Sequence, residues 1–83
     1  MTEKKLQKLI KSYDPRAELI KDSNREFRVF IYTGAKRYPI SNAIAKKDDW
    51  EITRISEYNP INETYPKYVI SLKRLYLKKE RRK

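Results

Sequence analysis

Residues 26–33 read Glu-Phe-Arg-Val-Phe-Ile-Tyr-Thr and form the most regular pattern in the chain. Aromatic and β-branched residues predominate in this stretch, and such residues favour strands. Alternate side chains of a strand point to opposite faces of the sheet. We therefore expect a central strand with a buried face and a second, partly exposed face that is a candidate working surface. The two faces hold an apolar set, Phe27, Val29 and Ile31, and a mixed set, Arg28, Phe30 and Tyr32.

The segments around this strand predict further strands. Residues 17–21 are joined to it by the turn-forming run Asp22-Ser23-Asn24-Arg25, which indicates a hairpin. Residues 50–58 are a strand by composition, and residues 59–66 form a surface loop with two prolines. Residues 67–76 begin like a strand but also place Leu and Tyr at helical spacing. We favour a strand there, and a helix stays open.

Residues 2–13 predict an amphipathic helix. Leu6, Leu9, Ile10 and Tyr13 recur at the i, i+3, i+4 and i+7 positions of one helix face. Thr2 is suited to cap the start, and the sequence Asp14-Pro15 ends the helix because proline disfavours helical geometry in the residue before it.

The segment after the central strand contains Gly34, the only glycine. We expect a sharp turn there that uses the freedom of glycine to adopt positive φ. A lone glycine does not make a phosphate-binding loop, which needs several. Residues 37–40 predict a short edge strand, and Ser41 or Asn42 would then cap a brief helical turn over residues 43–47.

These elements predict an α+β fold in which an amino-terminal amphipathic helix packs on a small antiparallel sheet of three to five strands. A chain of 83 residues supports one core, so residues 1–77 are expected to form a single compact domain. Residues 78–83 are Lys-Lys-Glu-Arg-Arg-Lys and lack an apolar anchor. They are expected to form a mobile basic tail.

The composition argues against most enzyme classes. There is no cysteine and no histidine, so disulfides, thiol nucleophiles, the usual zinc ligands and the usual neutral-pH base are all missing. We expect no catalytic residues, no metal and no cofactor. Asp48, Asp49 and Glu51 are a weak alternative metal site, with capping the favoured role. A ribonuclease that uses Arg, Lys, Tyr and Glu remains an alternative, because these residue types are present.

The net charge of +10 predicts binding to a polyanion, most simply DNA or RNA. Residues 59–83 hold eight basic and two acidic residues. Trp50 is expected in the core, whereas Tyr38 and Tyr65 lie in turn-like sequence and are expected to be exposed. The predicted contacts combine cations for phosphates with an aromatic ring for bases, and comprise Lys36, Arg37, Tyr38, Lys46, Lys47, Arg54, Lys73, Arg74, Lys78, Lys79, Arg81 and Arg82.

An alternative function is a protein–protein inhibitor or adaptor that docks on an acidic groove of a larger complex, with Phe30 and Tyr32 in its contact patch. The glycine-poor composition resembles that of small phage and archaeal virus proteins, which would make such an inhibitor an anti-defence protein. The order of elements is similar to that of double-stranded-RNA-binding domains, but their glycine-rich loop and Lys-Lys-x-Ala-Lys run are absent.

The remaining expectations concern location and assembly. No membrane span or signal peptide is visible in the sequence, which predicts an intracellular, cytoplasmic protein without membrane contact. An exposed strand edge would allow a homodimer.

Overall fold

A computed structural model describes residues 1–59, 61 and 64–75. It has two α-helices, a short 3-10 helix and four strands, which confirms the predicted α+β fold. In chain order the elements are α1 (Glu3–Tyr13), β1 (Glu18–Lys21), β2 (Glu26–Ile31), η1 (Gly34–Lys36), α2 (Arg37–Ala45), β3 (Trp50–Glu57) and β4 (Tyr68–Arg74).

The strands form one antiparallel sheet in the order β1-β2-β4-β3. Two hairpins, β1-β2 and β3-β4, are therefore joined through the pairing of β2 with β4. The predicted central position of β2 is confirmed, since it has a neighbour on each side. The strand favoured for residues 67–76 is also confirmed, as β4, over Tyr68–Arg74, and Tyr76 lies outside the described residues.

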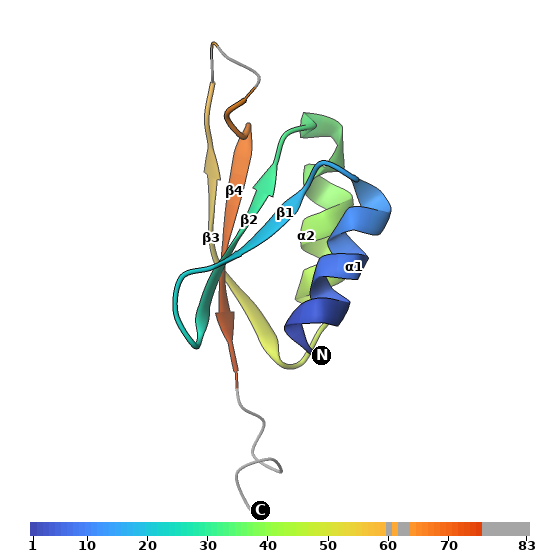
Figure 1. Cartoon of the computed structure of the whole chain (residues 1–83), viewed down its shortest axis with the longest axis vertical. Helices are drawn as coiled ribbons and strands as arrows, with labels where there is room; N and C mark the ends of the chain where they lie inside the picture. Colours follow the sequence, from blue (N-terminus) through green and yellow to red (C-terminus); the bar gives the residue numbers. More distant parts are fainter. Residues whose placement is uncertain (60, 62–63, 76–83) are drawn as a thin grey trace, which may run out of the picture.

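Both helices lie on the same side of the sheet and leave its other side uncovered (Figure 1). The core lies between these two layers. β2 contributes Phe27, Val29 and Ile31 to it, as predicted, and none is more than 1% exposed. The prediction that Trp50 belongs to the core is also confirmed, because its ring is 2% exposed and meets Phe27 edge-on with centroids 4.9 Å apart.

Helix α1 follows its sequence pattern closely. Leu6 and Ile10 are fully buried, and Leu9 packs against the same core. The Thr2 hydroxyl accepts a hydrogen bond from the Lys5 amide at 3.2 Å, so Thr2 is the expected cap. The helix ends at Asp14, one residue before Pro15. None of the helices in the described part of the chain is long and apolar enough to cross a membrane.

The prediction for residues 37–40 is wrong, because these residues open helix α2 instead of forming an edge strand. Pro39 is tolerated there since the amides of the first helical turn have no partner within the helix. Ile40 and Ile44 are four residues apart and both fully buried, so helical geometry puts two isoleucines into the core. Ser41 and Asn42 consequently lie inside the helix and are not its caps.

The expectation of positive φ at Gly34 is also wrong, since Gly34 has negative φ and begins η1. The chain reverses here through this helical turn, which any residue can adopt. A Cβ at this position would lie 3.5 Å from Cε2 of Tyr68, an ordinary van der Waals contact.

A β-bulge interrupts β3. Ile52 pairs with Leu72 and Arg54 with Ser71, so Thr53 is an extra residue on the β3 side. The Thr53 hydroxyl donates to the carbonyl oxygen of Ser71 at 3.2 Å. The bulge shifts the alternation of β3 by one residue, and as a result both Ile52 and Ile55 pack against the core.

Candidate functional site on the open face of the sheet

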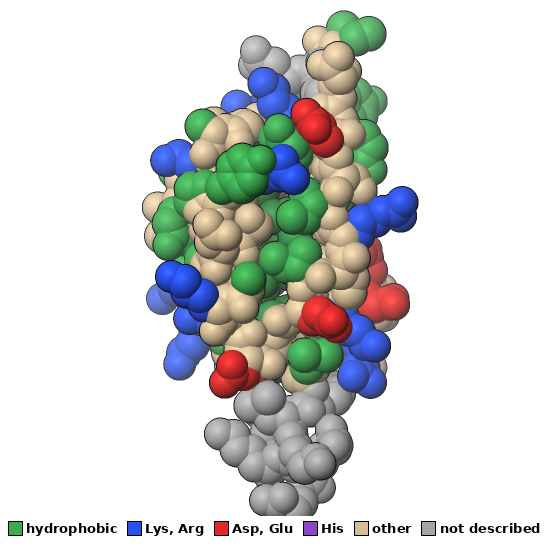
Figure 2. Space-filling model, turned by 180° about the vertical axis from the view of Figure 1, so that it is seen from behind, with side chains coloured by type: hydrophobic (Ala, Val, Ile, Leu, Met, Phe, Trp, Pro, Cys, Tyr) green, Lys and Arg blue, Asp and Glu red, His purple; other side chains and the backbone are tan. Residues whose placement is uncertain are grey.

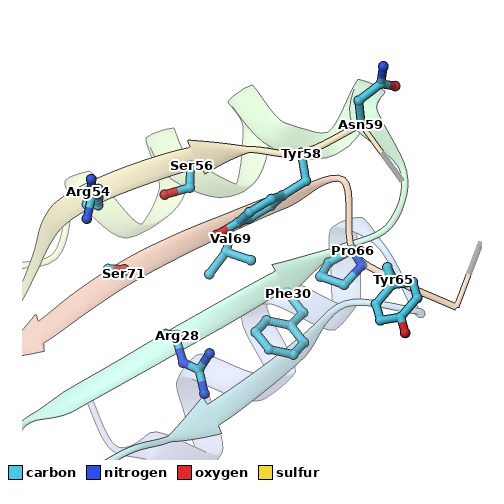
Figure 3. A pocket seen from close by; sticks show the side chains of 10 residues that line it. All are labelled: Arg28, Phe30, Arg54, Ser56, Tyr58, Asn59, Tyr65, Pro66, Val69 and Ser71. Atoms are coloured by element: carbon cyan, nitrogen blue, oxygen red, sulfur yellow. The ribbon is translucent and has the colours of Figure 1, made fainter. Parts of the chain in front are cut away.

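The uncovered side of the sheet carries a groove of about 500 Å³, which we call the sheet-face groove (Figure 3). It lies over β2, β4 and β3 and extends to the segments that follow β3 and precede β4. Three adjacent strands span about 10 Å, because neighbouring strands are about 4.8 Å apart. The ten described residues that line the groove include no Asp or Glu: Arg28, Phe30, Arg54, Ser56, Tyr58, Asn59, Tyr65, Pro66, Val69 and Ser71.

Strand pairing arranges most of these side chains in two rows across the sheet. In the first row Ser71 lies opposite both Arg28 and Arg54. We call this the arginine row. In the second row Val69 lies opposite both Phe30 and Ser56, and this row forms the floor of the groove.

The bulge at Thr53 places the β3 residues in these rows. If the same sequence paired regularly with β4, without a bulge, Arg54 would continue the alternation of Trp50 and Ile52 and point toward the core. With the bulge, Arg54, Ser56 and Tyr58 all face the groove.

Arg28 is held in place by its neighbours. Its Nε and Nη2 donate to the two carboxylate oxygens of Asp22 at 2.8 and 2.9 Å. Its guanidinium also lies over the ring of Phe30, 5.2 Å from the centroid. Hydrogen bonding to the Asp22 carboxylate is the main reason that the pKa of Arg28 is raised above its ordinary value. Arg28 therefore stays charged, but Asp22 balances that charge.

Arg54 differs from Arg28 although both are in the arginine row. Its side chain is exposed and has no ion pair or side-chain hydrogen bond with any residue that the structure describes. Arg54 therefore supplies the uncompensated positive charge of the groove.

Aromatic side chains form the opposite end of the groove. Tyr58 is 52% exposed, and its ring extends from β3 across β4 beside Val69 (Figure 3). Tyr65 is 64% exposed and lies next to Pro66 on the other side of the recess. Val69 is only 8% exposed although it points away from the helices. The tyrosines thus flank a sheltered apolar floor.

Lys73, a predicted contact, lies one row beyond the arginine row. It is opposite Glu26 on β2 and Glu51 on β3, and directly opposed side chains on one face are close neighbours. These two carboxylates offset the charge of Lys73. The positive region of the groove therefore ends near the arginine row.

The structure places two other predicted cations against aromatic rings. Arg74 packs over Trp50 at 5.5 Å, and its Nη1 is 3.8 Å from Oε2 of Glu3 on α1. Arg37 lies over both Tyr38, at 4.8 Å, and Tyr68, at 5.0 Å. Both arginines are half-buried, so packing occupies much of each side chain.

The remaining predicted contacts are not gathered with Arg54. Lys36 precedes α2, Tyr38 is in its first turn, and Lys46 and Lys47 follow its end. The nine residues of α2 separate these two groups by about 13 Å, on the side of the sheet opposite the groove. On the face seen in Figure 2, a central hydrophobic region has lysines and arginines around it, with acidic side chains among them. Lys78, Lys79, Arg81 and Arg82 lie outside the described residues.

The acidic cluster of residues 48–51 is divided by the fold. Asp49 is buried and forms an ion pair with the amino group of Met1, whereas Glu51 faces the open side of the sheet. Among residues 1–59, 61 and 64–75, no three His, Cys, Asp or Glu side chains are grouped as metal ligands would be.

Sequence reasoning anticipated part of the groove. Phe30 and Arg28 were expected on the working face, and the expected exposure of Tyr38 and Tyr65 is confirmed, at 64% each. The sequence analysis did not identify Tyr58, Ser56 or Ser71 as residues of the groove. The spacing of Trp50, Ile52 and Ile55 was an available signal, since a shift from two residues to three indicates a bulge.

No protein-family model matches this chain, and no curated protein or solved structure shows a significant match to it. Function must therefore be inferred from the chemistry of the groove.

Proposed function

We propose that this domain binds nucleic acid through the sheet-face groove, without catalysis and with little sequence specificity. One observation supports this proposal above all. The groove combines an uncompensated arginine with two exposed tyrosines and has no acidic residue among its described lining. Cations neutralise phosphates and release counterions, while exposed rings stack on bases.

The groove offers few means of reading a base sequence. Its polar groups besides the arginines are Ser56, Ser71, Asn59 and the tyrosine hydroxyls. Sequence-specific proteins place several fixed donors and acceptors against base edges, whereas stacking accepts any base. Contacts of these kinds support affinity more than discrimination.

A salt titration tests the proposal. Binding of fluorescent oligonucleotides to the full chain should weaken steeply between about 50 and 200 mM salt, with the labelled strands remaining intact. Arg54→Gln should reduce affinity. It should also make the slope of log K against log salt concentration, here called the salt slope, shallower by nearly the value of one phosphate contact. Lys8→Gln removes the same charge from the exposed surface of α1 and should have a smaller effect on both quantities.

Two outcomes would contradict the proposal. Weak retention that is equal for every strand form would support the protein-directed alternative, in which the apolar floor at Phe30 and Val69 receives a protein side chain. Cleavage of an RNA strand by the purified chain would support the ribonuclease alternative.

A further inference from the structure

We infer that the sheet-face groove receives unpaired nucleotides, so that the partner is single-stranded DNA or RNA and not a duplex. This inference rests on the proposed function and adds the form of the strand. It follows from the position of the aromatic rings relative to the arginine row, from the shape of the surface and from the accessibility of base faces.

The rings are placed to contact the flat faces of bases. Tyr58 reaches in from the end of β3 and Tyr65 from the segment before β4. Pro66 is drawn between the two tyrosine rings, and Phe30 lies to one side of them on β2 (Figure 3). Phe30 already packs against Arg28 and is half-buried, so the two tyrosines offer most of the accessible ring surface. A planar base stacked on either ring would also cover part of the apolar floor.

A duplex does not present its bases in this way. Paired bases are stacked on one another, and only their edges are accessible in the two grooves. The major groove admits a helix or a two-stranded ribbon, whereas here the rings flank a recess in the face of a four-stranded sheet. A base can enter this recess only if it leaves its stack, which costs a few kcal/mol for paired DNA and less for a strand that is already unpaired.

The cations are placed for the backbone of the same strand. Arg54 on β3 and Tyr58, the residue after the end of β3, are four residues apart, a distance of about 13 Å along an extended chain. A flexible single strand can place a phosphate at Arg54 and a neighbouring base at Tyr58. Because Asp22 holds Arg28 and balances its charge, Arg54 is the main phosphate contact and Arg28 a fixed hydrogen-bond donor.

The test compares strand forms and aromatic variants. The probes are oligothymidylate of about 12 nucleotides, its oligouridylate counterpart and a blunt hairpin duplex, each with a fluorescent label. Wild-type protein should bind the single strands more tightly than the duplex. Tyr58→Ala and Tyr65→Ala should each lower single-strand affinity roughly 5- to 150-fold, which corresponds to the loss of one stacked base.

Matched variants separate stacking from other effects. Tyr58→Phe keeps the ring and should retain most of the affinity. Tyr13→Ala removes a partly exposed tyrosine at the end of α1, away from the groove, and should leave binding unchanged. The salt slope should be the same for Tyr58→Ala and wild type, since the ring carries no charge. Circular dichroism of each variant confirms that it is folded.

The results distinguish failure of this inference from failure of the proposed function. If no probe binds with a salt dependence, the proposed function itself is wrong. If the probes bind but the duplex binds as tightly as the single strands, or Tyr58→Ala and Tyr65→Ala behave like Tyr13→Ala, nucleic-acid binding stands and the single-strand inference is overturned.

Discussion

Two arginines in one cross-strand row show how a single neighbour changes what a side chain can do. Arg28 and Arg54 flank Ser71 on the open face of the sheet. Arg28 donates two hydrogen bonds to Asp22, whereas Arg54 has no such partner in the described chain. The raised pKa of Arg28 keeps it protonated, so it adds no pH dependence to binding near neutrality.

Removing the charge of Asp22 should strengthen nucleic-acid binding. In Asp22→Asn the guanidinium of Arg28 loses its counterion, and the arginine row then presents two uncompensated charges. We expect tighter binding to oligothymidylate by a few-fold and a steeper salt dependence, by up to about 0.7 of a charge for a single strand. Fluorescence anisotropy at several salt concentrations measures both.

Asp22→Glu keeps the carboxylate and serves as the control, with binding close to wild type. Stability should change little in either variant, because exposed ion pairs contribute little to folding. Weaker binding by Asp22→Asn would mean that Asp22 is needed to position Arg28.

At the level of elements, the bulge in β3 connects the core to the groove. It turns Ile55 toward the helices and Arg54 toward the open face. A regular strand of the same sequence would bury one set of groove residues and expose one core isoleucine. The same local irregularity therefore serves packing and the candidate site.

The domain should tolerate deletion of Thr53. The deletion joins Ile52 directly to Arg54, so β3 becomes a regular strand in which Arg54 still pairs with Ser71 on the open face and Ile55 still pairs with Ile70 on the core face. We expect a loss of about 1 kcal/mol, because the hydrogen bond of Thr53 to Ser71 is lost while the core and the pairing are kept. Urea unfolding followed by tryptophan fluorescence measures this, since Trp50 is buried.

Thr53→Ala keeps the chain length and removes only the hydrogen bond to Ser71, at a cost of about 1 kcal/mol. A deletion that costs several kcal/mol more than this substitution would show that Thr53 is not simply an extra residue in β3.

At the level of the whole molecule, the two faces of the sheet have separate roles. The helices cover one face and enclose the core, and the other face carries the groove (Figure 1). Exposed positive charge is not confined to the groove side, because Lys4 and Lys8 are exposed on α1 and Lys46 is exposed after α2. A net charge of +10 attracts polyanions from a distance but also opposes compaction.

Salt should therefore change stability and binding in opposite directions. Raising the salt concentration from about 50 to 200 mM screens repulsion among the lysines and should raise the unfolding temperature. The same change should weaken oligonucleotide binding through counterion release. Thermal unfolding and anisotropy in identical buffers measure the two trends.

Sodium sulfate at matched ionic strength shows whether a specific anion contributes to the rise in unfolding temperature. An unfolding temperature that falls as salt is added would show that local ion pairs, such as Lys21–Glu3, outweigh the overall repulsion.

Local sequence patterns were sufficient to predict α1, the hairpin of β1 and β2, and β4, because each depends on a period or a turn that a few neighbouring residues define. They were also sufficient to predict that Trp50 is buried in the core. They failed at residues 37–40, where a β-like composition lies in a helix because Ile40 and Ile44 gain more by packing on the sheet. They also failed at Gly34, where a helical turn replaced the expected turn with positive φ.

The groove depends on contacts between residues far apart in the chain. Arg28, Ser71 and Arg54 become neighbours only because β4 pairs with β2 on one side and β3 on the other. Of the predicted cations, Arg54 alone among the described ones lines the groove. Charge and composition indicate that a chain attracts polyanions, but only strand order and the bulge determine which cations and rings share a face, since these arise from long-range packing.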